Sequence, residues 1–269
     1  MYLTDLHTHT ILSPDGHAPL LDMAQAAVDF GISAMMVTDH FDMLNTDGQR
    51  VLSYDWTAGL EQYQKSAPRF KGRLKLGFGL ELGSLHISPQ HARTILTQAG
   101  DNLDMVIGSI HNYREENGGG EYYFGVYNTP QVCHAALDDY FTSMEELVSN
   151  PDCYDVLGHI IYPLRYMHRD KQDITLTSYR DRLAQILRTV IETGRSIEVN
   201  TCRGHTVEDW RDILKLYRDL GGTLVTTGSD AHRPKDLGNG ILESFQLLQE
   251  CGFHHITMYT HRTPEQIGI

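Results

Sequence analysis

The chain has 269 residues, of which 41% are hydrophobic and 21% charged, an ordinary globular composition that excludes a disordered chain. Asp and Glu exceed Lys and Arg by 35 − 22 = 13, and this acidic excess disfavours nucleic acid and anionic membranes as partners. No apolar run approaches the roughly 18 residues of a membrane span, and the first residues lack the pattern of a signal peptide, so we expect a cytoplasmic protein.

Seven short β-rich runs recur along the chain and alternate with helical patterns. In chain order they span residues 3–9, 34–40, 75–82, 104–111, 155–160, 196–200 and 223–230. Most are apolar without clean alternation, which is typical of strands buried on both faces of a parallel sheet. A final run at 256–260 is a candidate for an eighth, weaker strand.

Four amphipathic stretches between these runs end at a glycine, as helices often do. They cover residues 20–28, 179–190, 207–217 and 237–248, and the glycines are Gly31, Gly194, Gly221 and Gly252. Thr206 is placed to cap the third helix. Seven β-then-α units favour one domain, residues 1–269, built as a closed α/β barrel, with an open doubly wound sheet as the alternative.

Polar residues concentrate where the predicted strands end. In a barrel of parallel strands these ends meet at one face, so the residues would line a single cavity. They are His7, His9, Asp39, His40, Glu81, His111, His159, Glu198, Asn200, Asp230 and His232.

The spacing of these residues indicates metal binding. His7 and His9 are two apart on a strand, so both side chains point the same way, and Asp230 and His232 repeat the spacing. Imidazoles with carboxylates suit Zn, Mn or Fe. The set exceeds the needs of one tetrahedral ion, which predicts two or three divalent ions with Glu81 as a bridge. The four cysteines form no CxxC pair, so neither a thiolate zinc site nor a disulfide framework is expected.

Each signal alone has a structural alternative. A buried histidine at a strand end is more often hydrogen-bonded than metal-bound, and Asp39 could be a turn residue or a helix cap. The remaining histidines favour surface or packing roles, apart from His17 and His205, which stay open. Those assigned to surface or packing are His86, His91, His134, His168, His254, His255 and His261.

The strand ends carry the motifs Asp-Leu-His7-Thr-His9-Thr, Thr-Asp-His40, Gly-Ser-Ile-His111, Gly-His159 and Ser-Asp230-Ala-His232, together with Glu81. Taken in order, these features resemble the polymerase-and-histidinol-phosphatase (PHP) superfamily. The resemblance covers essentially the whole chain. Within the superfamily the stretches around Arg165 and Arg203, and the chain length, are most similar to stand-alone histidinol phosphatases. The resemblance implies a distorted (β/α)7 TIM-like barrel with a trinuclear metal centre at the C-terminal ends of its strands.

The resemblance also implies a ligand set for each metal ion. The first ion would be held by His7, His9, Glu81 and Asp230. Glu81 would bridge to the second ion, which His111 and His159 would also hold. The third would be held by Asp15, His40 and His232. His17, two residues from Asp15, competes for the same role.

The sequence lacks the motifs of other phosphatase mechanisms. It contains no Cys-x5-Arg loop, no Asp-x-Asp-x-Thr, no GxSxG elbow and no GxxxxGK loop. A metal-bound hydroxide is then the expected nucleophile. Arg165 and Arg203 follow strands on the same face, and a guanidinium binds phosphate through two parallel hydrogen bonds. Asp39, His40 or His232 could assist proton transfer, and the sequence does not rank them.

These observations predict a metal-dependent phosphomonoesterase whose substrate is L-histidinol phosphate. The residues Asp42, Tyr113, Glu115 and Tyr162 could form an acidic or aromatic side of the pocket for the amine and imidazole of that substrate. The alternatives are a phosphodiesterase or exonuclease, a broad-specificity phosphatase acting on nucleotides, and a non-catalytic metal-binding module. An amidohydrolase-like barrel would usually need a lysine where Glu81 stands.

Overall fold

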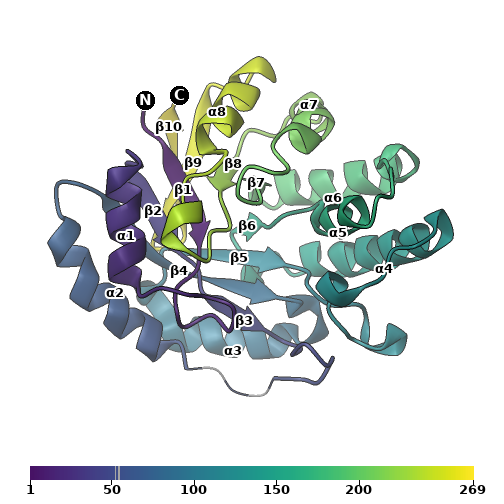
Figure 1. The fold of residues 1–269 in the computed structure, drawn as a ribbon, viewed down its shortest axis with the longest axis horizontal. Coiled ribbons are helices and arrows are strands. Elements are labelled where there is room, and N and C mark those ends of the chain that lie inside the picture. Colours follow the sequence, from purple (N-terminus) through teal and green to yellow (C-terminus); the bar gives the residue numbers. More distant parts are fainter. Residues whose placement is uncertain (52, 54) are drawn as a thin grey trace.

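A parallel sheet that curves into a distorted barrel forms the centre of the molecule (Figure 1). The computed structural model describes residues 1–51, 53 and 55–269. The strand order is β1-β2-β4-β5-β6-β7-β8, and β3 pairs with β4. The strands are β1 (Thr4–Thr8), β2 (Ala34–Val37), β3 (His40–Asp42), β4 (Lys75–Gly83), β5 (Met105–Ser109), β6 (Val156–Leu157), β7 (Ser196–Asn200) and β8 (Val225–Gly228).

Helices surround the strands in Figure 1 and bury their outer faces. They are α1 (Leu20–Asp29), α2 (Thr57–Phe70), α3 (Pro89–Ala99), α4 (Pro130–Val148), α5 (Tyr162–Arg169), α6 (Arg180–Glu192), α7 (Arg211–Asp219) and α8 (Ile241–Glu250). None of the helices within the described ranges is long and apolar enough to cross a membrane. The predicted α/β barrel is confirmed, and the open-sheet alternative is wrong because β1 and β8 come together.

Contact between β1 and β8 closes the barrel near the strand ends. The Asp230 N–H donates to the His7 carbonyl at 2.9 Å, and the His9 N–H donates to the Ala231 carbonyl at 2.9 Å. Nearer the start of these strands, the Thr227 hydroxyl donates to the Thr4 carbonyl at 2.7 Å. Side-chain contacts there take the place of a regular ladder, which distorts the barrel.

The barrel interior is apolar at the end where the strands begin. A small core composed only of strand residues fills it: Leu6, Ala34, Met36, Met105, Ile107, Val156, Met258 and Tyr259. The last two belong to β9 (His255–Thr260), which pairs antiparallel with β10 (Thr263–Gly268). This hairpin closes the bottom of the barrel. The run at 256–260 is therefore a strand, but it does not join the barrel sheet as an eighth member.

Two other local expectations were wrong. The predicted strand at 34–40 divides into β2 and β3, because Asp39 leaves the ladder and accepts hydrogen bonds from Thr10 and Ser13 of the loop after β1. Thr206 does not cap a helix. Its hydroxyl donates instead to the carbonyl of Asn200 at 2.9 Å, and a 3₁₀ turn precedes α7.

Glycines on the inward face of β4 make room for the interior. A methyl group at Gly77 would lie 2.6 Å from the sulfur of Met36, and one at Gly79 would lie 2.4 Å from the carbonyl oxygen of Met105. The sulfur belongs to a flexible side chain that can move, but the carbonyl belongs to the neighbouring strand β5. Gly79 therefore sets the spacing between β4 and β5 directly below Glu81.

We expect Gly79→Ala to lower the free energy of unfolding by about 1–3 kcal/mol, the usual cost of inserting a methyl group into a packed interior. The midpoint of urea unfolding measures this loss. Gly120→Ala is the matched control, because no atom lies within 4 Å of its added methyl group. Equal midpoints for the two variants would contradict the assigned role of Gly79.

Candidate metal centre

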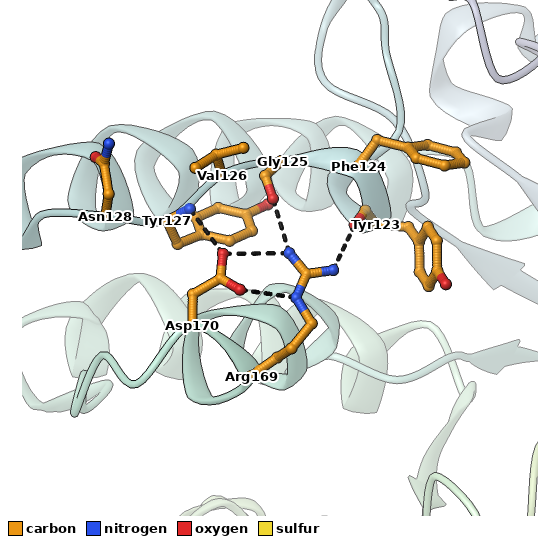
Figure 2. Close-up of a pocket in the computed structure, with 8 residues that line it drawn as sticks. All are labelled: Tyr123, Phe124, Gly125, Val126, Tyr127, Asn128, Arg169 and Asp170. Atoms are coloured by element: carbon orange, nitrogen blue, oxygen red, sulfur yellow. Dashed lines mark hydrogen bonds and ion pairs between the residues drawn. The ribbon is translucent and has the colours of Figure 1, made fainter.

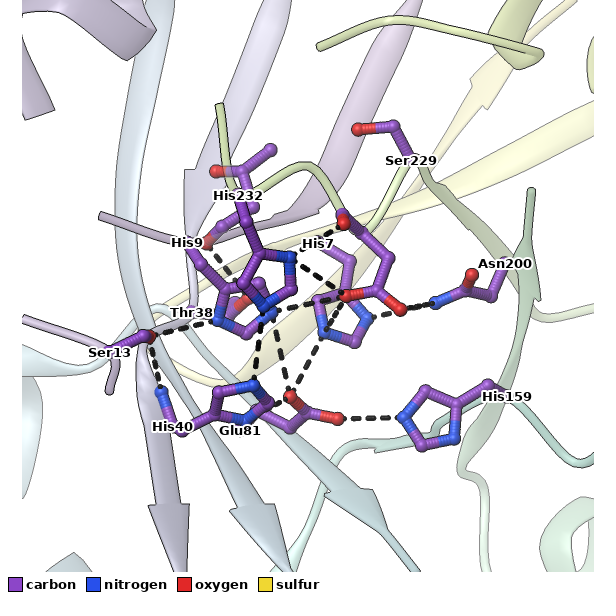
Figure 3. Close-up of polar contacts among 12 residues, drawn as sticks. His7, His9, Ser13, Thr38, His40, Glu81, His159, Asn200, Ser229 and His232 are labelled. Atoms are coloured by element: carbon purple, nitrogen blue, oxygen red, sulfur yellow. Dashed lines mark hydrogen bonds and ion pairs between the residues drawn. The ribbon is translucent and has the colours of Figure 1, made fainter. Parts of the chain in front are cut away.

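A buried carboxylate, Glu81 on β4, lies at the centre of the histidine cluster (Figure 3). In the strand register it is paired with His40 on β3, so the fold of the sheet itself brings these two residues together. The Nδ1 atom of His40 lies 2.8 Å from Oε2 of Glu81. The two oxygens of Glu81 point to different groups of ligand candidates.

The first group comes from β1 and the turn after β8. The Nε2 atoms of His7 and His9 lie 3.2 and 3.6 Å from Oε2 of Glu81. Asp230 places its Oδ1 atom 3.3 Å from Nε2 of His9 and 3.8 Å from Nε2 of His7. The potential ligand atoms of His7, His9 and Asp230 lie within 4.8 Å of one another, so these three could hold one ion.

The second group lies on the opposite side of Glu81. Its Oε1 atom is 3.1 Å from Nε2 of His111 and 2.8 Å from Nε2 of His159. Those two nitrogens are 3.2 Å apart. Oε1 is directed to His111 and His159, whereas Oε2 is directed to His7, His9 and, at 2.8 Å, His40. Glu81 therefore has the geometry of a bridge between ion sites.

The third group is more exposed. The Nε2 atoms of His40 and His232 are 3.4 Å apart, and Oδ2 of Asp15 lies 3.1 Å from Nε2 of His232. His17 instead contacts Arg233, whose Nη2 atom lies 3.0 Å from its Nε2. The structure therefore brings Asp15, and not His17, to this group. His9 also lies within ligand distance of His40 and His232.

Hydrogen bonds at the far nitrogens orient four of the rings. The Nδ1 atom of His7 contacts Glu198 Oε1 at 2.7 Å, and that of His111 contacts Asp42 Oδ1 at 2.6 Å. The Nδ1 atom of His9 contacts Ser13 Oγ at 3.1 Å, and that of His232 contacts the Asp230 carbonyl at 2.9 Å. A carboxylate or carbonyl oxygen can only accept, so Nδ1 carries a proton in His7, His111 and His232, and Nε2 is the nitrogen left to bind an ion. Metal-bound histidines are held in this way.

Several buried atoms in the cluster have no hydrogen-bond partner within the described structure. They include Nε2 of His7, Nε2 of His9 and Oε2 of Glu81. Unsatisfied buried acceptors are costly. These three atoms converge on one another, so a divalent cation among them would satisfy all three, and the residues present fit such a group.

The charges in the cluster also suit cations. Burial alone would raise the pKa of Glu81, but His7, His111 and His40 outweigh it and hold the pKa of Glu81 well below its usual value. Burial, reinforced by the neighbouring His232 and His40, lowers the pKa of His9 well below its usual value. Glu81 is thus ionised and His9 neutral at neutral pH, which are the forms that bind metal ions. Burial favours neutral rings, but the neighbouring carboxylates outweigh it and raise the pKa values of His7, His40 and His111, so an ion that binds there displaces protons from these rings.

The two predicted phosphate-binding arginines differ in their surroundings. The side chain of Arg165 on α5 is 8% exposed, and its Nη1 donates to Asp230 Oδ2 at 3.0 Å while Nη2 donates to Asn200 Oδ1 at 2.5 Å. Its Nε has no partner among the described residues. Arg203 is exposed, has a left-handed φ of 58°, and forms no ion pair within the described ranges. Arg165 is therefore bonded to the cluster, whereas the guanidinium of Arg203 has no carboxylate partner among the described residues.

Asp39 is buried and both of its oxygens already accept hydrogen bonds. Oδ1 accepts from the Thr10 N–H at 2.6 Å and from the Ser13 hydroxyl at 2.7 Å, and Oδ2 accepts from the Thr10 hydroxyl at 2.8 Å. Ser13 in turn contacts Nδ1 of His9. These contacts favour a positioning role for Asp39 over proton transfer.

The four residues proposed for the acidic or aromatic side of the pocket do not lie together: two contact the cluster and two do not. Tyr162 packs its ring 4.8 Å from that of His159 and 5.2 Å from that of His111. Asp42 contacts Nδ1 of His111. Tyr113 bonds Tyr127, and Glu115 pairs with Arg50 at 2.6 Å on the surface. Only Tyr162 and Asp42 among the four contact the cluster.

Glu198 and Asn200 have closer contacts with the cluster than sequence reasoning assigned to them. Both side chains are buried on β7 and contact His7. A signal was present, because they stand two residues apart at a strand end, like His7 and His9. Ser13 gave no such signal, since its position in a loop has no period.

Comparison with known proteins agrees with this geometry. The family model described as "PHP domain" matches residues 5–202, and the chain belongs to this family. A histidinol-phosphatase from Lactococcus lactis is 25% identical over 95% of this chain and 94% of its own length. A crystal structure of the Lactococcus lactis histidinol phosphate phosphatase, complexed with zinc, L-histidinol and phosphate, superposes with a TM-score of 0.84 at 25% identity over 98% of both chains. A Listeria monocytogenes structure, 17% identical, covers 89% of this chain and 99% of its own with a TM-score of 0.76, and shares the fold.

We expect Glu81→Gln to be the most damaging single change in the cluster, because it removes the shared negative charge from both ion sites at once. Protein purified without chelators should contain two to three transition-metal ions per chain in the wild type and at least one fewer in the variant, as measured by elemental analysis. Wild-type metal content and near-full activity in the variant would show that Glu81 is not a bridge.

Proposed function

We propose that the chain is a metal-dependent phosphomonoesterase that hydrolyses L-histidinol phosphate to L-histidinol and phosphate. The observation that carries this proposal is the position of Glu81, whose two oxygens face separate sets of histidines in a buried cluster. The Lactococcus lactis protein, which was crystallised with zinc, L-histidinol and phosphate, is similar along almost its entire length.

The ligand sets follow the three groups of the cluster. His7, His9, Asp230 and Glu81 hold the first ion, and Glu81, His111 and His159 hold the second. Asp15, His40 and His232 hold the third. Zn, Mn and Fe all suit this mixture of imidazole and carboxylate. Such ions supply an activated water nucleophile and neutralise charge on phosphate oxygens.

The protein residues around the ions bind and orient the phosphate. Arg203 has no carboxylate partner among the described residues, and Arg165 has an unpartnered Nε, so both can donate to phosphoryl oxygens. His40 and His232 are partly exposed, and in protein that lacks the third ion they are the candidates for moving a proton to the leaving alcohol. Asp39 keeps the loop of Thr10 and Ser13 in place.

Substrate selectivity comes from groups that suit a cationic, heteroaromatic alcohol. Tyr162 offers an aromatic face beside His111 and His159. The net charge of −13 disfavours long polyanions, so a small phosphate ester fits better than nucleic acid. The proposal assigns the enzyme to histidine biosynthesis in the cytoplasm.

We also propose that residues 1–269 act as one phosphatase domain. The family match ends at residue 202, but Asp230 and His232 lie beyond it and join the cluster. β8 also lies beyond it, and closes the barrel against β1. The last quarter of the chain therefore belongs to the same unit.

We expect Arg203→Lys to reduce kcat/KM at least about tenfold, equivalent to about 1.4 kcal/mol of transition-state stabilisation, because the planar fork of the guanidinium is lost. Its metal content should equal that of the wild type. Arg165→Lys should cause at least the same loss, and a fall in metal content alongside it would show that Arg165 acts mainly by holding Asp230.

Arg169→Lys is the matched control for both variants, since Arg169 lies on α5, the helix that holds Arg165. Arg169 pairs with Asp170 and donates to the carbonyls of Tyr123 and Gly125 in a surface pocket of about 450 Å³ (Figure 2). It contacts no member of the cluster, so its replacement should leave kcat/KM near the wild-type value. An equal loss in Arg169→Lys and Arg203→Lys would contradict the phosphate-binding role.

A panel of phosphate esters tests the substrate. With metal-loaded protein, kcat/KM for L-histidinol phosphate should exceed that for p-nitrophenyl phosphate, AMP and simple sugar phosphates by at least roughly a hundredfold, or about 2.7 kcal/mol. A flat profile would indicate a broad-specificity phosphatase. Preference for a dinucleotide or single-stranded DNA over every monoester would indicate a phosphodiesterase.

A further inference from the structure

Glu198 is a buried carboxylate on β7 that contacts histidines on both sides of Glu81. Its side chain is 1% exposed. Its Oε1 atom lies 2.7 Å from Nδ1 of His7, and its Oε2 atom accepts from the backbone N–H of His159 at 2.9 Å. His7 belongs to the first group of ligand candidates and His159 to the second. One carboxylate thus joins β1, β6 and β7 behind the cluster.

We propose that Glu198 is a positioning residue that sets the tautomer of His7 and the location of His159, and so couples the first two ion sites. This inference rests on the metal centre proposed above. An ionised carboxylate only accepts hydrogen bonds, so His7 must carry its proton on Nδ1. Its Nε2 atom then faces Glu81 and Asp230, which lie 3.2 and 3.8 Å away, and is the nitrogen that would bind an ion placed between them.

The surrounding backbone leaves room for this pair and for little else. A methyl group at Gly228 on β8 would lie 2.4 Å from Cβ of His7 and 2.5 Å from Oε1 of Glu198. No residue other than glycine fits there without displacing one of the two side chains. The close approach of β8 therefore restricts the positions that the His7 and Glu198 side chains can occupy.

Asn200 extends the contact to the arginine side of the cluster. Its Nδ2 donates to Oε1 of Glu198 at 3.2 Å and to Oδ2 of Asp230 at 3.4 Å, and its Oδ1 accepts from Arg165. Because Oε1 of Glu198 accepts from both His7 and Asn200, it fixes the orientation of the Asn200 amide. Glu198 is thereby connected to His7, to His159 and, through Asn200, to Asp230 and Arg165.

Glu198→Gln tests this role with little change of shape. Glutamine has one acceptor oxygen where glutamate has two, so it cannot accept from both His7 and His159. We expect the zinc affinity to fall about 10–100-fold, the usual effect of removing a hydrogen-bond partner of a metal ligand. Competition with a chromophoric chelator measures the affinity, and thermal unfolding with and without zinc shows whether the metal-free variant is folded.

Asp155→Asn is the matched control for loss of a buried carboxylate. Asp155 directly precedes β6 and pairs with Arg195 at 3.2 Å and Arg262 at 2.9 Å, near the apolar end of the barrel. This variant should unfold at a lower temperature but bind zinc like the wild type. Wild-type zinc affinity in Glu198→Gln would overturn the proposed role of Glu198 but not the metal centre. Absence of zinc binding in the wild type would overturn the metal centre as well.

Histidine-ring NMR of the zinc-loaded wild-type protein tests the same inference without a variant, should Glu198→Gln fail to fold. We expect ¹⁵N and ¹H signals of His7 that show a proton on Nδ1 and none on Nε2. A proton on Nε2 and none on Nδ1 would overturn the inference, whereas protons on both nitrogens would show that His7 binds no ion and would overturn the metal site.

Discussion

The burial of one carboxylate among five imidazoles governs the architecture of this protein. Glu81 is completely buried, and the rings of His7, His9, His40, His111 and His159 all lie within 3.6 Å of its oxygens. An unpaired buried carboxylate would cost several kcal/mol. Four stretches of chain must therefore reach the same point to stabilise it, and a closed barrel of parallel strands is a scaffold that brings their ends together.

This arrangement divides the barrel interior into two halves of opposite polarity. Below Glu81, strand residues and the β9–β10 hairpin form an apolar core with almost no charge. Above it lie the histidines and carboxylates of the cluster, with Asn200 and Arg165 beside them. The glycines of β4 separate the halves, because they let Met36 and the neighbouring strand approach from below without displacing Glu81. Stability and chemistry are thus assigned to different ends of the same strands.

Hydrogen bonds from the surrounding residues fix the positions of the histidines in the cluster. Asp39 and Ser13 hold the loop after β1, Asp42 orients His111, and Glu198 holds His7 and His159. Asp42 and Glu198 accept from the Nδ1 atoms of His111 and His7, and so leave the Nε2 atoms of these rings directed inward. The phosphate-binding side depends on this network too, since Arg165 is anchored to both Asp230 and Asn200.

Much of this could be predicted from the sequence because it depends on local periodicity. The apolar runs predict the strands, and the His7–His9 and Asp230–His232 spacings place two ligand candidates on one side of each chain segment. The convergence of Glu81, His111 and His159 follows from the barrel topology once parallel strands are assumed. These features need no knowledge of side-chain contacts, so the residue pattern alone carries them.

Other features required the folded structure because they depend on contacts between distant residues. The choice of Asp15 over His17, the anchoring of Arg165 by Asp230, and the pairing of Glu198 with His7 depend on contacts that follow no spacing rule. The Glu198–His7 contact, for example, joins residues 191 positions apart. The hairpin at the C-terminus could not be told from an eighth barrel strand, because both have the same apolar run. Only packing against the barrel interior distinguishes the two arrangements. An apolar run predicts that a strand forms, but it does not predict which strand it pairs with.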